Sequence, residues 1–164
     1  MSSERLESLD RAVKVLLGQA AVRDAIAGLK VDIQSSPEPF VWSVVDCEAL
    51  GDTLPTDIKS GWIFVLRRDT PSGAHHHPNS VQHMVMVEGA GRSVVAGRER
   101  RMLRFDSAGI APRDLWYVID RNVTHEFFPE GEDVVVISFH TCEPDQLVEV
   151  AEGSGHVRRY EHAH

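Results

Sequence analysis

The chain has 164 residues, a formal net charge of −8 and 42% hydrophobic residues. This length favours a single domain with a packed core, and the acidic surface argues against a nucleic-acid partner. No apolar run approaches the roughly 20 residues of a membrane span, the polar N-terminus does not resemble a signal peptide, and the two cysteines do not form a disulfide framework. We therefore expect a cytoplasmic protein without a membrane partner.

The first predicted element is an amphipathic helix over residues 3–29, within an N-terminal helical segment of residues 1–33. Apolar residues recur there at three- and four-residue steps, beginning with Leu6, Leu9 and Val13. Gly18 is expected to kink the helix or to divide it in two. The helix lacks histidine, cysteine and aromatic residues, so we expect it to cover one face of the fold or to lie in a homodimer interface.

Short β-rich runs separated by turn residues fill the chain from residue 34 to residue 150. They span residues 40–45, 61–68, 81–87, 93–96, 101–105, 115–119, 123–128 and 134–141. Strands do not alternate with helices, so the predicted fold class is all-β, either a sandwich or a barrel. Residues 151–164 bear glycine and histidine, and we expect them to form a mobile tail.

A basic cluster of four arginines lies between Arg98 and Arg104, on a predicted hairpin of this acidic chain. Such a charge run usually forms a solvated face of a hairpin. The functional alternative is a contact with an anion or with a partner.

The stretch from residue 73 to residue 91 holds the residues best suited to chemistry. His75 and His77 are two apart, so in an extended segment they point to the same side. Gln82 lies in the predicted strand over residues 81–87, in which Met84 and Met86 share its face. Two imidazoles with an oxygen-bearing side chain on a neighbouring strand can converge on a divalent metal such as iron, zinc, copper or nickel.

This stretch resembles the first motif of the cupin family, in which Gly, His-x-His, Glu and Gly follow one another at set distances. His75, His77 and Gly89 match that motif. Gln82 stands where the family has a metal-binding Glu, and Asp69 stands where it has the first Gly. By this resemblance, His75, His77 and Gln82 are metal ligands.

The second cupin motif is matched only at His125, while Asp114, Asp120 and Pro129 replace its other anchors. The resemblance covers about residues 61–142. It implies a double-sheet jelly-roll barrel with His125 as a further metal ligand.

Because Gln82 stands where the family has Glu, the expected set of metal ligands carries no negative charge. The metal then keeps its full positive charge and binds anionic oxygen ligands better. Glutamine is also a poor metal ligand, so Gln82 either coordinates directly or stands back and hydrogen-bonds a bound water. In both cases three histidines leave open positions, as catalytic sites require.

Aromatic and sulfur-bearing side chains near these histidines are candidates for a substrate pocket. The predicted lining consists of Phe64, Met84, Met86, Trp116 and Phe127. The alternative for each is an ordinary place in the barrel core. Tyr117 and His140 are candidates for moving a proton.

The resemblance to three-histidine cupins implies a non-haem iron dioxygenase that acts on a small diketone, phenolic or other enolisable compound. Fe(II) is the expected metal, with nickel, zinc and manganese as alternatives. Two other functions remain open: a redox-neutral metal-dependent lyase or isomerase, and a non-enzymatic cupin that binds a small ligand or a metal. A purely structural barrel with vestigial histidines is the fourth reading. The expected partners are a small-molecule substrate and a second copy of the chain.

Overall fold

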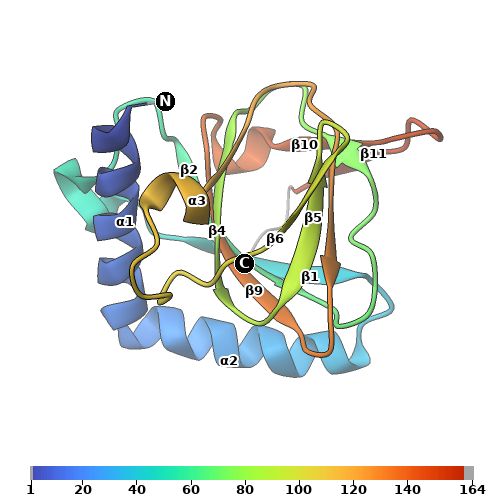
Figure 1. Ribbon diagram of the computed structural model, residues 1–164, viewed down its shortest axis with the longest axis horizontal. Helices are drawn as coiled ribbons and strands as arrows, with labels where there is room; N and C mark the ends of the chain where they lie inside the picture. The colour runs from blue at the N-terminus through green and yellow to red at the C-terminus, as the bar shows by residue number, and fades with distance from the viewer. Residues whose placement is uncertain (1, 161–164) are drawn as a thin grey trace.

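The computed structural model describes residues 2–160 and shows two antiparallel β-sheets with two helices against one of them (Figure 1). The predicted all-β class with a helical N-terminus is confirmed. The strands lie mostly where the alternating apolar pattern indicates, because this period is what a half-buried sheet requires.

The five-stranded sheet is built from the longest apolar runs. Its order is β1 (Phe40–Val45), β2 (Ser60–Leu66), β9 (Val134–His140), β4 (Gln82–Glu88) and β7 (Tyr117–Ile119). Central β9 is rich in β-branched residues and buried along its whole length, as expected of a strand covered on both faces.

The six-stranded sheet contains most of the short strands and carries three histidines, His75, His76 and His125. Its order is β11 (Val157–Arg159), β10 (Val148–Ala151), β3 (His75–His76), β8 (His125–Pro129), β5 (Gly91–Val95) and β6 (Arg98–Arg101). Residues 2–160 also include three short helical turns: η1 (Glu48–Thr53), α3 (Pro112–Leu115) and η2 (Pro144–Gln146).

The N-terminal segment forms two helices, α1 (Ser3–Gly18) and α2 (Ala20–Ser35). The side chain of Ser2 caps α1 by accepting a hydrogen bond from the Arg5 backbone. The chain divides at Gly18, as its glycine suggested, and Gln19 is extended between the helices. Their apolar faces bury against the five-stranded sheet of the same chain, so they do not need a second copy to cover them.

Two hydrophobic cores follow from the alternation of side chains along the strands. The outer core joins both helices to the outer face of the five-stranded sheet and is mainly aliphatic. The inner core fills the space between the sheets with aromatic residues and methionines. On β4, Met84 and Met86 belong to the inner core and Val85 to the outer one.

Two backbone positions explain how the chain turns around the histidine stretch. Gly89 has a φ of 98°, and a Cβ there would lie 2.6 Å from the Asp133 carbonyl oxygen. Only glycine fits this position without a shift. Asp69, at the position where the cupin motif has glycine, also has a positive φ, of 54°. Its side chain accepts a hydrogen bond from the Gly131 backbone at 2.9 Å.

The predicted mobile tail is wrong for residues 151–160. Strand β11 pairs with β10, and Tyr160 is only 3% exposed, packed against the inner core. The buried ring of Tyr160 anchors this segment to the inner core. The polar composition of the segment gave no sign of this contact. Residues 161–164, with His162 and His164, lie outside the described residues.

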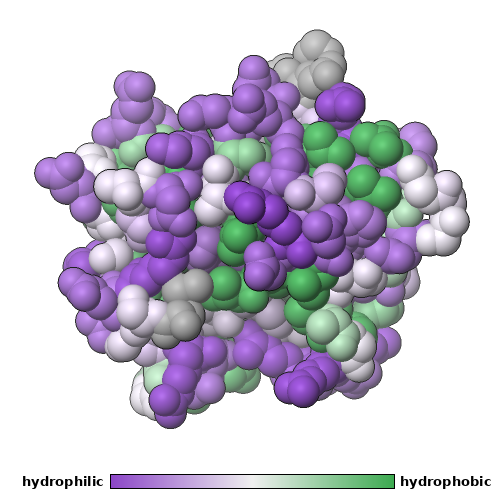
Figure 2. All heavy atoms as spheres, turned by 90° about the horizontal axis from the view of Figure 1, so that it is seen from above, coloured by the Kyte–Doolittle hydropathy of each residue, from purple (hydrophilic) through white to green (hydrophobic). Residues whose placement is uncertain are grey.

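The exposed basic cluster, which covers β6 and continues to Arg104, is largely matched by neighbouring groups. Arg101 pairs with Glu130 at 3.0 Å and Arg104 with Asp106 at 2.9 Å, while Arg100 lies 3.8 Å from the Tyr117 ring centroid. These contacts favour the solvated-hairpin interpretation. The surface seen in Figure 2 is mainly hydrophilic, with small hydrophobic patches between polar side chains. No helix within residues 2–160 is long and apolar enough to cross a membrane.

Candidate metal centre

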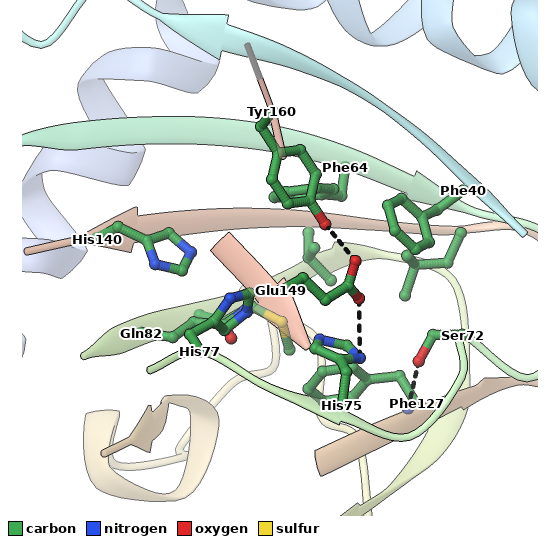
Figure 3. Close-up of a pocket in the computed structure, with 13 residues that line it drawn as sticks. Phe40, Phe64, Ser72, His75, His77, Gln82, Phe127, His140, Glu149 and Tyr160 are labelled. Carbon is green, nitrogen blue, oxygen red and sulfur yellow. Dashed lines mark hydrogen bonds and ion pairs between the residues drawn. The ribbon is translucent and has the colours of Figure 1, made fainter. Parts of the chain in front are cut away.

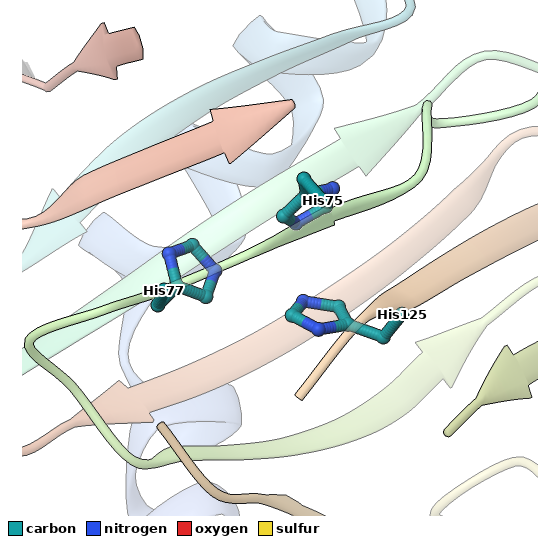
Figure 4. Close-up of side chains that lie close together, drawn as sticks. All are labelled: His75, His77 and His125. Atoms are coloured by element: carbon teal, nitrogen blue, oxygen red, sulfur yellow. The ribbon is translucent and has the colours of Figure 1, made fainter. Parts of the chain in front are cut away.

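Three histidines from two neighbouring strands meet inside the barrel. His75 on β3 pairs with His125 on β8, and His77 follows two residues after His75 on the same side. All three are buried, and one ring nitrogen from each lies within 4.8 Å of the others (Figure 4). Among residues 2–160 this is the one such cluster of histidine, cysteine or acidic side chains. The predicted convergence of His75, His77 and His125 is therefore observed.

Each ring is oriented by a hydrogen bond to a backbone carbonyl. The Nδ1 atoms lie 2.7–2.9 Å from the carbonyl oxygens of Gly73 (for His75), Val148 (for His77) and Val123 (for His125). A carbonyl only accepts, so we assign the proton of each neutral ring to Nδ1. This leaves the three Nε2 lone pairs available to a metal, because a hydrogen bond at Nδ1 fixes both the tautomer and the orientation of the ring.

The electrostatics favour neutral rings for His77 and His125 at physiological pH. Burial, and then the neighbouring His75, lower the pKa of His77 to about 4. Burial is also the largest cause that lowers the pKa of His125 well below its ordinary value. A neutral imidazole binds a metal without first losing a proton.

Two buried polar atoms at this site have no hydrogen-bond partner, namely His125 Nε2 and Gln82 Oε1. A buried acceptor without a partner is costly, so its presence calls for a group that completes it. A divalent cation suits both atoms because nitrogen and oxygen lone pairs are its ligands. The residues present therefore fit a metal held by His75, His77 and His125, with Gln82 beside it.

A small cavity opens beside the histidines (Figure 3). Its volume is about 40 Å³, and most of its wall is apolar. The residues that line it are Phe40, Phe64, Leu66, Ser72, His75, His77, Gln82, Met84, Phe127, Val136, His140, Glu149 and Tyr160. Phe64, Met84 and Phe127 thus lie where the sequence placed them, in the pocket wall.

Two predicted pocket residues lie elsewhere. Met86 belongs to the inner core without lining the cavity. Trp116 belongs to the outer core, where its indole N–H donates to Asp10 of α1 at 2.5 Å. The short helix α3 precedes Trp116, so the parity counted along a strand beginning at residue 115 does not apply to it.

The two candidates for proton transfer differ in position. His140 lines the cavity, with its ring centroid 5.2 Å from that of His77. Its two nitrogens already lie 2.8 Å from Ser80 Oγ and 3.2 Å from Ser138 Oγ. Tyr117 is buried outside the cavity wall, and its hydroxyl lies 2.6 Å from Ser93 Oγ.

Sequence reasoning missed Glu149 and Tyr160, which both line the cavity. Glu149 on β10 lies 3.1 Å from His75 Nδ1 and accepts a hydrogen bond from the Tyr160 hydroxyl at 2.9 Å. Burial and the nearby Glu149 raise the pKa of Tyr160 well above its ordinary value, so its hydroxyl stays protonated. The alternating run from Val148 to Ala151 was the available signal for a strand with Glu149 on one face.

Several solved structures share the fold of this chain. A variant of the salicylate 1,2-dioxygenase from Pseudoaminobacter salicylatoxidans is 15% identical, with a TM-score of 0.55 over 80% of this chain and 37% of that protein. Another variant, in complex with gentisate, gives 16% identity and a TM-score of 0.55 over 80% and 35%. The coconut allergen cocosin gives 15% and 0.52 over 71% and 29%.

At these identities the likeness shows the fold alone, and the chain spans about a third of the length of those proteins. No family model and no curated protein sequence matches the chain. The structural neighbours are cupins, and the resemblance at His75, His77 and Gly89 points the same way. The chain therefore has the all-β cupin fold, with a cluster of three histidines inside its barrel.

Proposed function

We propose that the protein is a metal-dependent dioxygenase that acts on a small enolisable compound, with Fe(II) as its metal. The observation that carries this proposal is the set of three imidazoles that share one buried, mostly apolar cavity with Gln82. Without a carboxylate ligand, a divalent cation there keeps its charge for an anionic oxygen ligand such as an enolate.

The side chains at the site suggest a role for each group. His75, His77 and His125 would hold the metal, and Gln82 would meet it directly or through a water. The bound iron would supply the redox chemistry with dioxygen and would stabilise the enolate form of the substrate. The walls formed by Phe64, Met84, Phe127 and their neighbours exclude water, which strengthens electrostatic interactions inside.

The cavity also supports a choice of substrate. Its volume of about 40 Å³ is far below the roughly 300–1,000 Å³ of pockets for drug-sized ligands, so a compound of few atoms fits best. Among the side chains that line it, Glu149 is the one carboxylate, and no lysine or arginine is present. A substrate carboxylate would find no cationic side chain there, so we propose a small diketone without a free acid group.

The structural neighbours support the oxygenase class without identifying the substrate. Salicylate 1,2-dioxygenase shares the fold, and its name describes dioxygen chemistry on a compound with a carboxylate. The cavity wall of this chain contains no lysine or arginine, and this separates its proposed substrate from salicylate.

A second candidate, a redox-neutral lyase or isomerase, is favoured by one observation. His140 lines the cavity with its ring centroid 5.2 Å from that of His77, so an imidazole lies near a substrate held by the metal and could move a proton there. Oxygen consumption separates the two candidates, because only the dioxygenase requires it.

The decisive experiment measures metal content and oxygen uptake together. Protein loaded with Fe(II) should consume oxygen with pentane-2,4-dione and much less with acetoacetate, which is similar in size but carries a carboxylate. Substrate loss without oxygen uptake would favour the lyase or isomerase. Metal binding without turnover of a panel of small diketones and phenols would favour a binding protein. Failure to bind any divalent metal would refute the proposal.

We also propose that the protein is a homodimer. Since the apolar faces of α1 and α2 already pack on the barrel, a dimer would use an edge strand such as β1 or β7 instead. Light scattering at micromolar concentration tests this, and a monomeric mass would refute it.

A further inference from the structure

We propose that Glu149 is a positioning residue of the metal centre and supports His75 with a carboxylate that lies outside the ligand set. This inference rests on the metal site of the proposed function. It concerns a side chain that touches a metal-binding histidine without belonging to the cluster itself.

The register of the six-stranded sheet brings Glu149 to His75. Strand β10 runs antiparallel to β3, with Val150 opposite His76 and Ala151 opposite His75. Glu149 therefore shares a face with His75, one diagonal step along the ladder, within reach of a long side chain. Its Oε1 lies 3.1 Å from His75 Nδ1, and the residue is only 5% exposed (Figure 3).

The carboxylate is held firmly in this buried place. Its other oxygen, Oε2, accepts from the Tyr160 hydroxyl at 2.9 Å and lies 3.0 Å from Arg158 Nε. A buried carboxylate is retained in its charged form only when such partners compensate for lost water. Both partners approach Oε2, so Oε1 remains directed at His75.

The contribution of Glu149 is its charge rather than the choice of tautomer. The Gly73 carbonyl lies nearer to His75 Nδ1, at 2.7 Å, and already fixes the proton there. When a cation binds at Nε2, the imidazole ring becomes more positive, and a carboxylate at 3.1 Å stabilises that charge. Such outer carboxylates raise the basicity of a histidine ligand and change metal affinity by about 10–100-fold.

A second histidine–glutamate pair, formed by His76 of β3 and Glu152 just after β10, offers a control that is more exposed to solvent. His76 Nδ1 lies 2.9 Å from Glu152 Oε1, which also accepts from the Thr124 hydroxyl. This pair has the same chemistry as Glu149 and His75, but His76 lies outside the histidine cluster. A variant at Glu152 therefore removes an equivalent carboxylate without approaching the metal.

The test measures the zinc affinity of metal-free protein by competition with a chromogenic chelator. Glu149→Gln keeps the shape and removes the charge, so zinc affinity should fall about 10–100-fold. Glu152→Gln should stay within about twofold of the parent. Tyr160→Phe, which removes one partner of Glu149, should give a smaller loss of several-fold. The visible spectrum of cobalt-loaded protein should shift in Glu149→Gln and stay unchanged in Glu152→Gln.

Failure of this inference can be told apart from failure of the proposed function. If the parent protein binds no zinc, the metal site and the proposed function both fall. If the parent binds zinc and Glu149→Gln binds it equally well, only the role of Glu149 is overturned. Thermal unfolding of each metal-free variant checks folding. If Glu149→Gln does not fold, Tyr160→Phe serves as the test. Unchanged zinc affinity and an unchanged cobalt spectrum in Tyr160→Phe would then overturn the role of Glu149.

Discussion

The two faces of the five-stranded sheet are made by the same strands, yet they are built for different tasks. The outer face is aliphatic and sealed by α1 and α2. The inner face is aromatic and sulfur-bearing, and it borders a cavity with four histidines in its wall or beside it. Alternation along β2, β4 and β9 separates them, with Ile63, Val85 and Ile137 outside and Phe64, Met84 and Val136 inside.

The two faces of the five-stranded sheet are expected to contribute differently to the stability of the fold. The outer face is the larger continuous apolar core, so its burial is expected to contribute much of the folding free energy. The inner face borders a cavity in which two ligand-type atoms lack partners, namely Gln82 Oε1 on this sheet and His125 Nε2 on the six-stranded sheet, and this costs stability. Such local costs are typical of a binding site.

The largest expected effect comes from the inner face. His77→Ala removes one of three nitrogen ligands, so metal content should fall from near-stoichiometric to almost none, as measured by elemental analysis. The control is His76→Ala, whose ring contacts Glu152 outside the cluster and whose loss should leave metal content unchanged. Circular dichroism checks that both variants fold. Full metal content in His77→Ala would remove His77 from the proposed ligand set.

On the outer face, Leu9→Ala should affect stability and not metal binding. Leu9 is 0% exposed, and truncating a buried leucine costs about 2–5 kcal/mol. Urea unfolding measures the loss, and a chelator competition checks that zinc affinity is unchanged. Val31→Ala on α2 is the control, since Val31 is 71% exposed and should change stability by no more than about 0.5 kcal/mol. A lower zinc affinity in folded Leu9→Ala would show that the two faces are coupled.

Acid should act on both faces, through His77 inside and His83 outside. Burial is the largest cause that lowers the pKa of each to about 4, from 6.5. The unfolded chain therefore binds protons first, and stability present at pH 7 is lost as the pH falls through 6.5 toward 4. The loss by pH 5 is on the order of 1–2 kcal/mol per histidine.

Urea unfolding of the metal-free protein at pH 7, 6 and 5 measures this loss. His83 accepts hydrogen bonds from Arg5 of α1, while Arg5 also pairs with Asp57 at 2.8 Å. In His83→Gln the Arg5–Asp57 pair remains, and the acid-dependent loss of stability should become smaller. An unchanged pH dependence in this variant would exclude His83 as a contributor.

The smallest expected effect on affinity belongs to Gln82→Glu. The two side chains have nearly the same shape, so folding should survive. The added charge should tighten metal binding by several-fold, because it attracts the cation directly. It should also weaken binding of an enolate and lower turnover. Metal content and oxygen uptake are measured side by side. Lower metal content, or unchanged turnover, would mean that Gln82 lies outside the working site.

Periodicity predicted the parts of the fold and site that depend on short distances along the chain. The parity of His75 with His77, and of Gln82 with Met84, follows from strand geometry and is observed. It failed at Trp116 because a helical turn interrupts the strand count there. Glu149 reaches His75 through pairing of β10 with β3, and no local pattern reveals a contact between segments so far apart in sequence.

The strict alternation on β4 limits how the length of the chain can vary. Gln82 faces the cavity, and His83 faces α1. Adding or removing one residue between Gln82 and Met86 would turn the following side chains to the opposite face and carry methionines into the aliphatic core. The ladder already accommodates an extra residue between Met86 and Glu88, where its register shifts. Changes in length are therefore expected in the loops flanking β4 or at this bulge, and not within the strand itself.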